Sequence, residues 1–317
     1  MALVQTLVSL LTSLAMMLSV HIPFVPKQEG VLLSAGILSD THIDARLPLG
    51  QLLLARALDD INAAGDTVDA IVVAGDMTNY GDGESVRAFY ELFDKHCGAA
   101  DWVLASGNHE IGHVEDVSQA QARQRLIDTY NAYTGAHTEN IYYSVTVNDF
   151  RFIVLGDQSD DSWDSPDINA DQLAFLDAQL AGATAEGKPA FVVCHWPVEG
   201  TNGQSVIWED GSMGSENSTN VRAILEKYSN VFFISGHVHT GINGELTQKL
   251  FGFSCVEQQN GVTYVNLPTF LLVNRYGIPW GGMGFQMEVY ENQVLFRARN
   301  YLTSKWYPSY DYAVPLQ

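Results

Sequence analysis

Five short motifs in this sequence carry residue types that bind metal ions. In chain order, their polar residues are Asp40 and His42 (SDTH), Asp76 (AGDM), Asn108, His109 and Glu110 (GNHE), His195 (CHWP), and His237 and His239 (GHVH). Imidazole nitrogens with carboxylate or amide oxygens, and no thiolate, suit Mn, Fe, Zn, Co or Ni rather than Ca. One such residue alone would usually be solvated or cap a helix, but five motifs together have no such structural explanation. Their number exceeds the needs of one open catalytic zinc and suits two ions that share a bridging carboxylate.

Each motif directly follows an apolar run that predicts a β-strand. The five runs are residues 35–39, 69–74, 102–105, 190–194 and 231–235. Open α/β sheets place their ligand sites at the carboxyl ends of such strands, so the motifs are expected to converge there. Glycines at 75, 107 and 236 allow a sharp exit from the strand and a close backbone approach.

The rest of the chain alternates amphipathic helices with further strands. Helices are predicted over 49–64, 84–96, 119–133, 171–180 and 221–228. In the first of these, one helical face collects Leu52, Leu53, Ala57, Leu58 and Ile61. Strands are predicted over 141–147 and 150–155, joined by a tight Asn148-Asp149 turn, and over 262–267, 285–290 and 294–298, while 197–219 is predicted as a polar loop. The pattern indicates one α/β domain over 31–317, in which helices cover mixed sheets.

The first 30 residues differ from this pattern. Residues 2–26 contain no Asp, Glu, Lys or Arg, and 2–20 are mostly apolar, long enough for a marginal membrane span or a signal-peptide core. An extracytoplasmic or membrane-anchored protein is therefore expected, with membrane association through residues 2–20. The alternative is a cytoplasmic protein with a docked amphipathic helix, whose polar stripe would be Gln5, Ser9, Thr12 and Ser13.

Composition restricts the partners of the protein. The 317 residues include 37 acidic and 16 basic side chains, a formal charge of −21, and 46% are hydrophobic, which excludes a disordered acidic chain. A polyanion repels nucleic-acid phosphates, so a long nucleic acid is not an expected partner. The three cysteines, Cys97, Cys194 and Cys255, are too few for a disulfide framework; three buried thiols are favoured over one disulfide and one thiol.

The five motifs in this order resemble the calcineurin-like metallophosphoesterases, whose pattern is D-x-H, GD, GNH[DE], H and GH-x-H. The resemblance implies a four-layer α/β/β/α sandwich of two mixed sheets flanked by helices. It also implies two sites for divalent or trivalent metal ions, which share Asp76 as a bridge. One ion would be held by Asp40, His42, Asp76 and His239, and the other by Asp76, Asn108, His195 and His237. His109 would face the substrate as a catalytic residue, and Glu110 would orient it.

The implied reaction is hydrolysis of a phosphoester by a hydroxide that bridges the two ions and attacks phosphorus directly. His109 would protonate the leaving alkoxide or stabilise the transition state. Two divalent ions bring four positive charges against the two negative charges of Asp40 and Asp76, so the site becomes positive within an acidic protein. A small phosphoester is therefore the expected substrate, as a monoester or a diester. The alternative function is a non-catalytic metal-binding scaffold on the same fold.

Within this superfamily, the chain is most similar to the bacterial branch related to cyclic-nucleotide phosphodiesterases and to purple acid phosphatases. The segments that carry this similarity are SDTHI, GDMTNYGD, YYSV, DQLAFLDAQL and GKPAFVVCHWP. Purple acid phosphatases use a Tyr three residues after the bridging Asp, where this chain has Asn79, so their iron–tyrosinate site is not expected. Candidate substrate contacts are Asn79, Arg46, His113 and the loop 197–219, while Trp196 and Trp208 are expected to pack rather than to stack on a substrate.

Overall fold

The computed structural model describes residues 29–63, 68–242, 252–270 and 281–317. Residues 1–28 lie outside this set, so the prediction of an anchor, signal or docked helix over 1–30, and the localisation derived from it, stays a prediction. Across the described ranges, no helix combines the length and the apolar character needed to cross a membrane.

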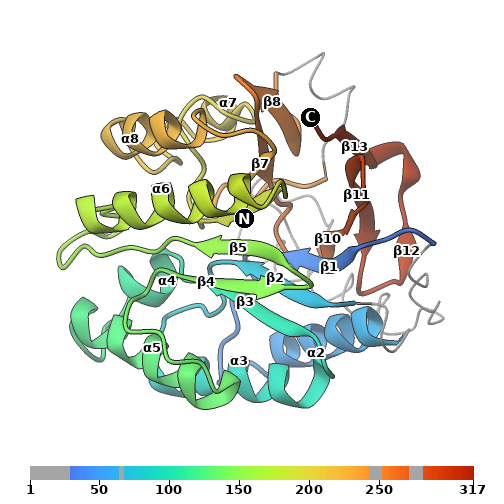
Figure 1. Cartoon of the computed structure of the whole chain (residues 1–317). Helices are drawn as coiled ribbons and strands as arrows, with labels where there is room; N and C mark the ends of the chain where they lie inside the picture. Colours follow the sequence, from blue (N-terminus) through green and yellow to red (C-terminus); the bar gives the residue numbers. More distant parts are fainter. Residues whose placement is uncertain (1–28, 64–67, 243–251, 271–280) are drawn as a thin grey trace.

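Two mixed β-sheets stack face to face in the middle of the molecule (Figure 1). The first has the order β12-β11-β10-β1-β2-β3 with β13 paired to β11, and the second has the order β4-β5-β6-β7-β9-β8. Strands β1, β2 and β3 are parallel to one another, as are β5, β6, β7 and β9. The first sheet comprises β1 (Leu33–Leu38), β2 (Ala70–Ala74), β3 (Asp101–Ala105), β10 (Met283–Val289), β11 (Gln293–Asn300), β12 (Lys305–Trp306) and β13 (Tyr312–Pro315). The second comprises β4 (Tyr143–Val147), β5 (Phe150–Val154), β6 (Ala190–Val193), β7 (Val231–Ser235), β8 (Val256–Gln259) and β9 (Val262–Asn266).

Helices cover the outer face of each sheet, which completes the predicted four layers (Figure 1). The first sheet carries α2 (Pro48–Asn62), α3 (Gly83–His96), α4 (Asn108–Ile111) and α5 (Gln119–Thr134). The second carries α6 (Ala170–Ala185), α7 (Gln204–Ile207) and α8 (Ser215–Leu225), and a 3-10 turn, η1 (Pro308–Tyr310), precedes β13. The α/β sandwich of two mixed sheets flanked by helices is thus confirmed.

Strand alternation separates the core into three apolar layers. In β1, Leu33, Ala35 and Ile37 face the second sheet, and Leu38 faces the helices. In the same strand, Gly36 allows helix α2 to pack closely, because a Cβ at this position would lie 3.1 Å from the side chain of Ile61 in that helix. Both faces of the central strands are buried, so β2 is apolar along its whole length and β1 has a single polar residue, Ser34, rather than a polar residue at every second position.

Several sequence-based boundaries were wrong for identifiable reasons. The helix predicted over 221–228 begins earlier, at Ser215, and ends at Leu225. The prediction missed its first turns because most of their residues are polar and lie at the surface. The predicted polar loop 197–219 therefore contains α7 and the start of α8. Leu52 was placed on the buried face of α2, yet it is 54% exposed, and Leu54 is buried in its stead. The short strands β8, β12 and β13 were not predicted, since two to four residues are too few to show a period.

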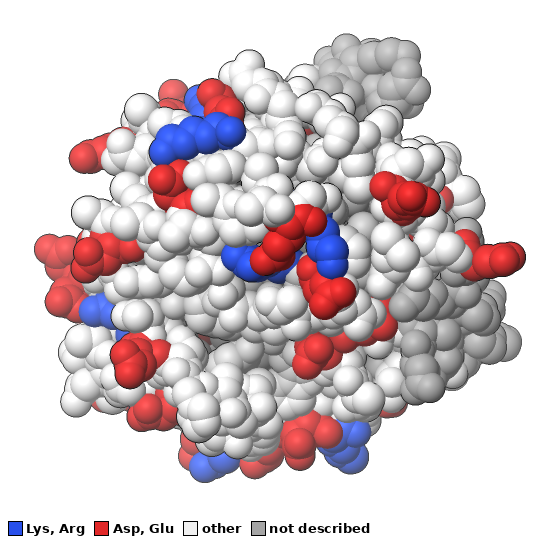
Figure 2. All heavy atoms as spheres, viewed as in Figure 1, with Lys and Arg blue, Asp and Glu red and all other residues white. Residues whose placement is uncertain are grey.

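Two local predictions are confirmed. Asn148 and Asp149 both have positive φ, 47° and 65°, as a two-residue turn between β4 and β5 requires. All three cysteines are free and buried. Figure 2 shows that acidic side chains are spread over the visible face, with most basic groups lying beside them, so the charge of −21 is distributed and forms no single patch there.

Candidate metal centre

The predicted ligands lie where five parallel strands from both sheets end. Strands β1, β2 and β3 lead to the first three motifs, and β6 and β7 lead to the last two. Five of the ligands have a left-handed backbone with φ between 45° and 71°: Asp40, His42, Asp76, His237 and His239. Non-glycine residues rarely adopt this conformation, and each costs on the order of 1–3 kcal/mol. The fold thus maintains backbone strain at the positions that were predicted to bind metal.

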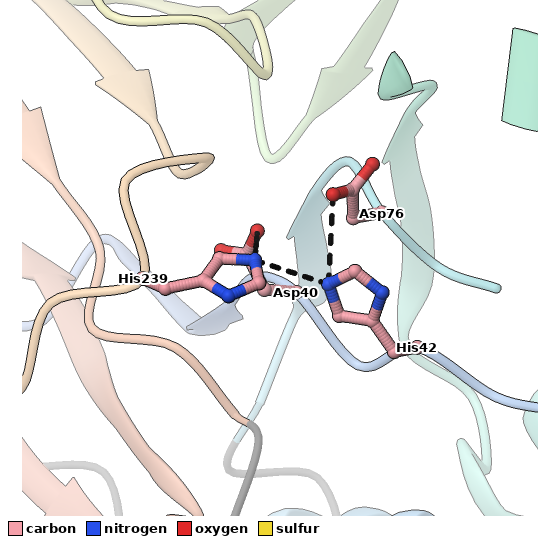
Figure 3. Close-up of side chains that lie close together, drawn as sticks. All are labelled: Asp40, His42, Asp76 and His239. Carbon is pink, nitrogen blue, oxygen red and sulfur yellow. Dashed lines mark hydrogen bonds and ion pairs between the residues drawn. The ribbon is translucent and has the colours of Figure 1, made fainter. Parts of the chain in front are cut away.

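One group of side chains consists of Asp40, His42, Asp76 and His239 (Figure 3). The Nε2 atom of His42 lies 3.1 Å from Nε2 of His239 and 3.5 Å from Oδ2 of Asp76. His239 Nε2 in turn lies 3.1 Å from Oδ1 of Asp40. Two imidazole nitrogens and two carboxylates therefore converge on one point, and this is the set predicted for the first ion.

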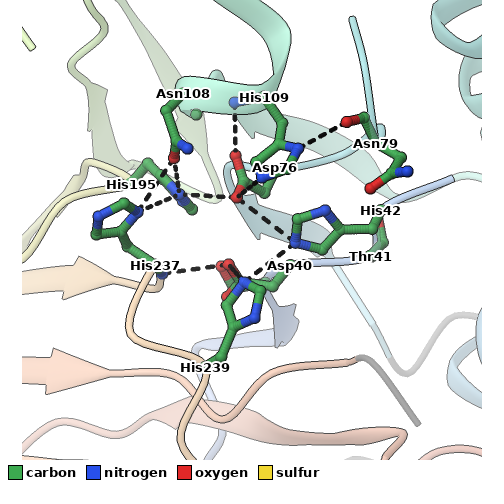
Figure 4. Close-up of polar contacts among 12 residues, drawn as sticks. Asp40, Thr41, His42, Asp76, Asn79, Asn108, His109, His195, His237 and His239 are labelled. Carbon is green, nitrogen blue, oxygen red and sulfur yellow. Dashed lines mark hydrogen bonds and ion pairs between the residues drawn. The ribbon is translucent and has the colours of Figure 1, made fainter. Parts of the chain in front are cut away.

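A second group consists of Asp76, His195 and His237, joined by Asn108 (Figure 4). Oδ1 of Asn108 lies 3.1 Å from both Nε2 of His195 and Nδ1 of His237. The same His195 atom lies 3.2 Å from Oδ2 of Asp76. This is the set predicted for the second ion, and it includes the amide oxygen.

Asp76 belongs to both groups through a single oxygen atom. Its Oδ1 accepts the backbone N–H of His109 at 3.1 Å, which turns Oδ2 toward the imidazoles of both groups. Gly107 is required for this approach, because a Cβ there would lie 2.1 Å from Asp76 Oδ1. The carboxylate is thereby fixed in the orientation of a bridging ligand.

The donor set fits two divalent cations. Asp40 is completely buried; its Oδ1 accepts the backbone N–H of His237 at 3.2 Å, while its Oδ2 has no hydrogen-bond partner. A buried carboxylate oxygen without a partner is costly unless a cation compensates for it. The contact between the His42 and His239 nitrogens likewise requires a proton or a cation between them. Nitrogen and oxygen donors of this kind suit Mn, Fe, Zn, Co or Ni.

Backbone hydrogen bonds determine which imidazole nitrogen faces the centre. Nδ1 of His195 lies 2.8 Å from the carbonyl oxygen of Ala74. A carbonyl only accepts, so Nδ1 carries a proton, and Nε2 is the nitrogen directed toward Asp76 and Asn108. A cation that replaces the proton on Nε2 would therefore find His195 in the tautomer that a metal ligand needs.

Strong electrostatic coupling accompanies this geometry. Burial lowers the pKa of His42 to about 3 and holds that of His237 well below its usual value. Burial acts in the same direction on His195, but the Asp76 carboxylate outweighs it and raises the pKa to about 9. For Asp76 and Asp40, burial alone would raise the pKa, but His195 and His239 respectively outweigh it, so both carboxyls stay ionised. A cation would compete with protons for the same lone pairs.

His109 lies at the edge of the centre, in the first turn of α4. Its Nε2 is 3.9 Å from Asp76 Oδ2, and its Nδ1 is 2.6 Å from the carbonyl oxygen of Asn79. Glu110 was expected to orient this ring, but its carboxylate accepts from the N–H and hydroxyl of Thr78 and from the N–H of Gly107. None of these bonds joins the Glu110 carboxylate to the His109 ring, so Glu110 supports that ring through the backbone of the loops after β2 and β3. It is a buried anchor for two of the ligand-bearing loops.

Sequence reasoning missed two residues beside the centre, Trp163 and Asp164. Asp164 Oδ1 accepts a hydrogen bond from Asn108 Nδ2 at 2.9 Å and lies 3.2 Å from His113 Nε2. Both residues belong to the loop after β5, which begins with Gly156 and Asp157. That Gly-Asp pair repeats the Gly75-Asp76 pair that follows β2 and could have drawn attention to this loop.

The predicted substrate contacts have mixed outcomes. Arg46 forms a two-point ion pair with Asp44, at 2.8 and 3.0 Å. Trp196 is completely buried and donates to the Asp164 carbonyl, and Trp208 stacks on His237 with ring centroids 4.7 Å apart. Both tryptophans therefore pack, as expected. Asn79 and His113 were predicted to contact the substrate. The distances within the protein do not test these two contacts, which stay predictions.

Comparisons with known proteins agree with this geometry. The family model described as calcineurin-like phosphoesterase matches residues 33–241. A cAMP/cGMP dual specificity phosphodiesterase of Mycobacterium tuberculosis is 28% identical over 236 residues, which cover 69% of this chain and 64% of that protein, so the match spans less than two thirds of the relative. Among solved structures, a dimetal phosphatase from Danio rerio aligns with a TM-score of 0.64 and 15% identity, over 90% of this chain and all of that one. A purple acid phosphatase from yellow lupin seeds aligns with a TM-score of 0.57 and 15% identity, over 92% of this chain and 55% of that one. The two structures show a shared fold.

Proposed function

The chain belongs to the calcineurin-like phosphoesterase family, and from that premise we propose that it hydrolyses a small phosphoester at the centre around Asp76. The observation that carries this proposal is the shared position of Asp76 Oδ2 between two converging ligand groups. A non-catalytic metal-binding protein would have no need of His109 at the open edge of the centre. The alternative scaffold function is therefore the less well supported.

Two bound cations would supply Lewis-acid activation of water and of the phosphoryl oxygens, which is the chemistry such pairs provide in hydrolases. The chain's own residues would hold them. The first would be held by Asp40, His42, Asp76 and His239, and the second by Asp76, Asn108, His195 and His237. The left-handed backbone at these strand ends keeps the ligands oriented before any substrate arrives.

His109 is the proton donor in this proposal. The Asn79 carbonyl requires a proton on Nδ1, so the protonated imidazole can offer its second proton only from Nε2, which faces the centre. The backbone N–H of the same residue holds Asp76 Oδ1, which fixes the ring relative to the bridging carboxylate. His109 can thus deliver a proton to the departing oxygen, an effect worth roughly 10²–10⁴-fold in rate.

Charge favours a small substrate over a polymer. The protein carries a formal charge of −21, and acidic groups beyond a Debye length of about 8 Å from the centre are largely screened. A short phosphoester therefore interacts mainly with the centre itself, whereas a long polyanion would cross acidic surface. The similarity to a cyclic-nucleotide phosphodiesterase supports a diester as one candidate.

The experiment is hydrolysis of bis(4-nitrophenyl) phosphate and of 4-nitrophenyl phosphate, each with added Mn²⁺ and with chelator. We expect metal-dependent release of nitrophenol. Release from the diester alone identifies a phosphodiesterase, and release from the monoester alone identifies a phosphatase. Failure on both substrates, with two ions bound per chain, would overturn the proposal in favour of the scaffold. Asp76→Asn serves as the inactive control.

A further inference from the structure

The imidazole of His237, a ligand of the second group, has an indole ring stacked on one of its faces. The ring centroids of Trp208 and His237 lie 4.7 Å apart, and the two planes are inclined by only 25°. His237 is 3% exposed, whereas Trp208 is partly exposed. The indole therefore lies between this face of the imidazole and solvent. An indole N–H only donates, so Trp208 is not a metal ligand itself.

The stacked indole restricts the plane in which the imidazole can lie. Within that plane, Nδ1 of His237 lies 3.1 Å from Oδ1 of Asn108 and 3.1 Å from Nε2 of His195 (Figure 4). Three donor atoms of the second group thus meet at one point. A ring that tilted out of this plane would move Nδ1 away from that point, and it would lose its stacking contact with the indole.

The loop that carries Trp208 is closed at its base beside the second group. It follows His195 directly, and the N–H of Met213 donates to the carbonyl of Pro197 at 3.0 Å. The side-chain amide of Asn202 donates to three backbone carbonyls of the segment that contains β8 and β9, at 3.0, 3.2 and 3.1 Å. These bonds tie the loop to the second sheet, so the position of Trp208 is set by the fold.

Two further residues hold Trp208 within this loop. Gln204 is 1% exposed, and its Nε2 donates to the carbonyls of Trp208 and Glu209. The N–H of Gly211 donates to the Trp208 carbonyl at 3.0 Å. A Cβ on Gly211 would lie 2.8 Å from the indole, so only a glycine allows the backbone to approach the ring this closely. A buried side chain and a glycine therefore maintain the contact between Trp208 and His237.

We propose that Trp208 is a positioning residue for the second metal ion, whose stacked indole holds His237 in the plane that directs Nδ1 to that ion. The physical reason is preorganisation, because a ligand that is already oriented loses less conformational freedom when the cation binds. The inference concerns the metal centre alone, and it does not depend on the hydrolysis proposed above.

The test measures metal affinity rather than turnover. The full-length, metal-loaded protein is equilibrated in a buffered-chelator series with Mn²⁺, which resolves the two binding steps. We expect Trp208→Ala to weaken one step about tenfold, as loss of an outer-shell partner does, and to leave the other within twofold. The weakened step should still be present in Asp40→Asn, because Asp40 belongs to the first group alone. Equal weakening of both steps, or of neither, would overturn the inference.

Three variants distinguish the stacked ring from simple burial of His237. Trp208→Phe keeps a flat ring and should retain most of the affinity, whereas Trp208→Leu keeps an apolar side chain without a flat face and should resemble Trp208→Ala. Val206→Ala truncates a side chain that is 61% exposed in α7 of the same loop, and as the matched control it should leave both steps unchanged. Wild-type affinity in Trp208→Leu would show that the ring plane is not what Trp208 provides.

Cadmium-113 NMR of the cadmium-loaded protein gives a second readout, which reports ligand geometry. Each occupied position gives its own resonance. We expect Trp208→Ala to shift or broaden one resonance and to leave the other nearly in place, because His237 belongs to one ligand group only. Two unchanged resonances would overturn the inference.

A contact between Trp208 and the substrate would give a different result. Trp208→Ala would then raise KM for bis(4-nitrophenyl) phosphate at Mn²⁺ concentrations that fill both positions, while both metal affinities stayed at their wild-type values, and this would overturn the inference. A wild type that binds fewer than two ions would overturn it as well. A protein that binds two ions, loses one more readily in Trp208→Ala and hydrolyses no phosphoester would support the inference and remove the proposed function.

Discussion

The carboxylate of Asp164 accepts a hydrogen bond from Asn108 Nδ2 at 2.9 Å, which decides the atom that Asn108 presents to the metal centre. An amide can turn by 180° at little cost, and its nitrogen cannot bind a cation. Because Asp164 accepts only from the nitrogen, the oxygen is directed toward His195 and His237. A residue outside the ligand set therefore fixes the chemistry of a ligand.

We expect Asp164→Ala to weaken binding of the second ion by about 10–100-fold, as the loss of an outer-shell hydrogen bond typically does. The measurement is a metal titration in a buffered-chelator series, which resolves the two binding steps. Asp164→Asn is the control, because its amide oxygen can still accept from Asn108 Nδ2. The role of Asp164 would be refuted by equal affinities in the wild type and Asp164→Ala.

Asp76→Asn should empty both metal positions, because one oxygen of Asp76 serves both ligand groups. Asp40→Asn should affect mainly the first position, since Asp40 belongs to that group alone. Elemental analysis of the purified variants counts the ions bound per chain. Full occupancy in Asp76→Asn would contradict the bridging role of this carboxylate.

His109→Ala should lower turnover by roughly 10²–10⁴-fold while leaving metal content intact, because the ring faces the centre without completing either ligand group. Steady-state hydrolysis and elemental analysis are run on the same preparation. His137→Ala, at an exposed histidine after α5, controls for loss of an imidazole elsewhere. If His109→Ala lost both ions, its fall in activity would say nothing about proton transfer.

The sequence was sufficient for the fold class and for the convergence of the predicted ligands, and the physical reason is locality. Their division into two groups was implied by the family resemblance. Each ligand follows a buried strand within a few residues, and the carboxyl ends of parallel strands meet at one edge of a sheet. Asp40 and His239 follow strands of different sheets, so their contact depends in addition on the stacking of the two sheets. The buried, continuously apolar strands β2 and β7 are the clearest of these signals.

What the sequence did not reveal depends on contacts between loops. Glu110 reaches Thr78 because of the left-handed turn after β2, and no local pattern indicates this contact, whereas its bond to the Gly107 N–H is a local capping interaction at the start of α4. Trp163 and Asp164 lie in a loop without secondary structure, whose position is set by tethers from α5 and from other loop residues. Leu52 shows the same limit in a helix, where a neighbouring leucine takes the buried position.

Asp157 anchors the loop that carries Trp163 and Asp164, and its titration should affect stability. Burial raises the pKa of this carboxyl from 3.8 to about 6, although the Ser159 and Asp167 N–H groups act in the opposite direction. A raised folded-state pKa means that the contribution to stability is fully present below pH 4 and is lost as pH rises through about 6. At one pKa unit per 1.36 kcal/mol, the loss amounts to about 3 kcal/mol at neutral pH.

Asp157→Asn should remove this dependence while keeping the loop anchored. Both N–H groups donate to the same oxygen, Oδ1, which an asparagine also provides. We therefore expect the variant to gain stability relative to the wild type between pH 4 and pH 7, because only the wild type acquires a buried charge over that range. Urea unfolding at several pH values measures the free energy of unfolding of the wild type and of Asp157→Asn. In the difference between the two, the pH dependence of all other groups cancels. A difference that stays constant with pH would show that the Asp157 carboxyl titrates normally in the folded protein.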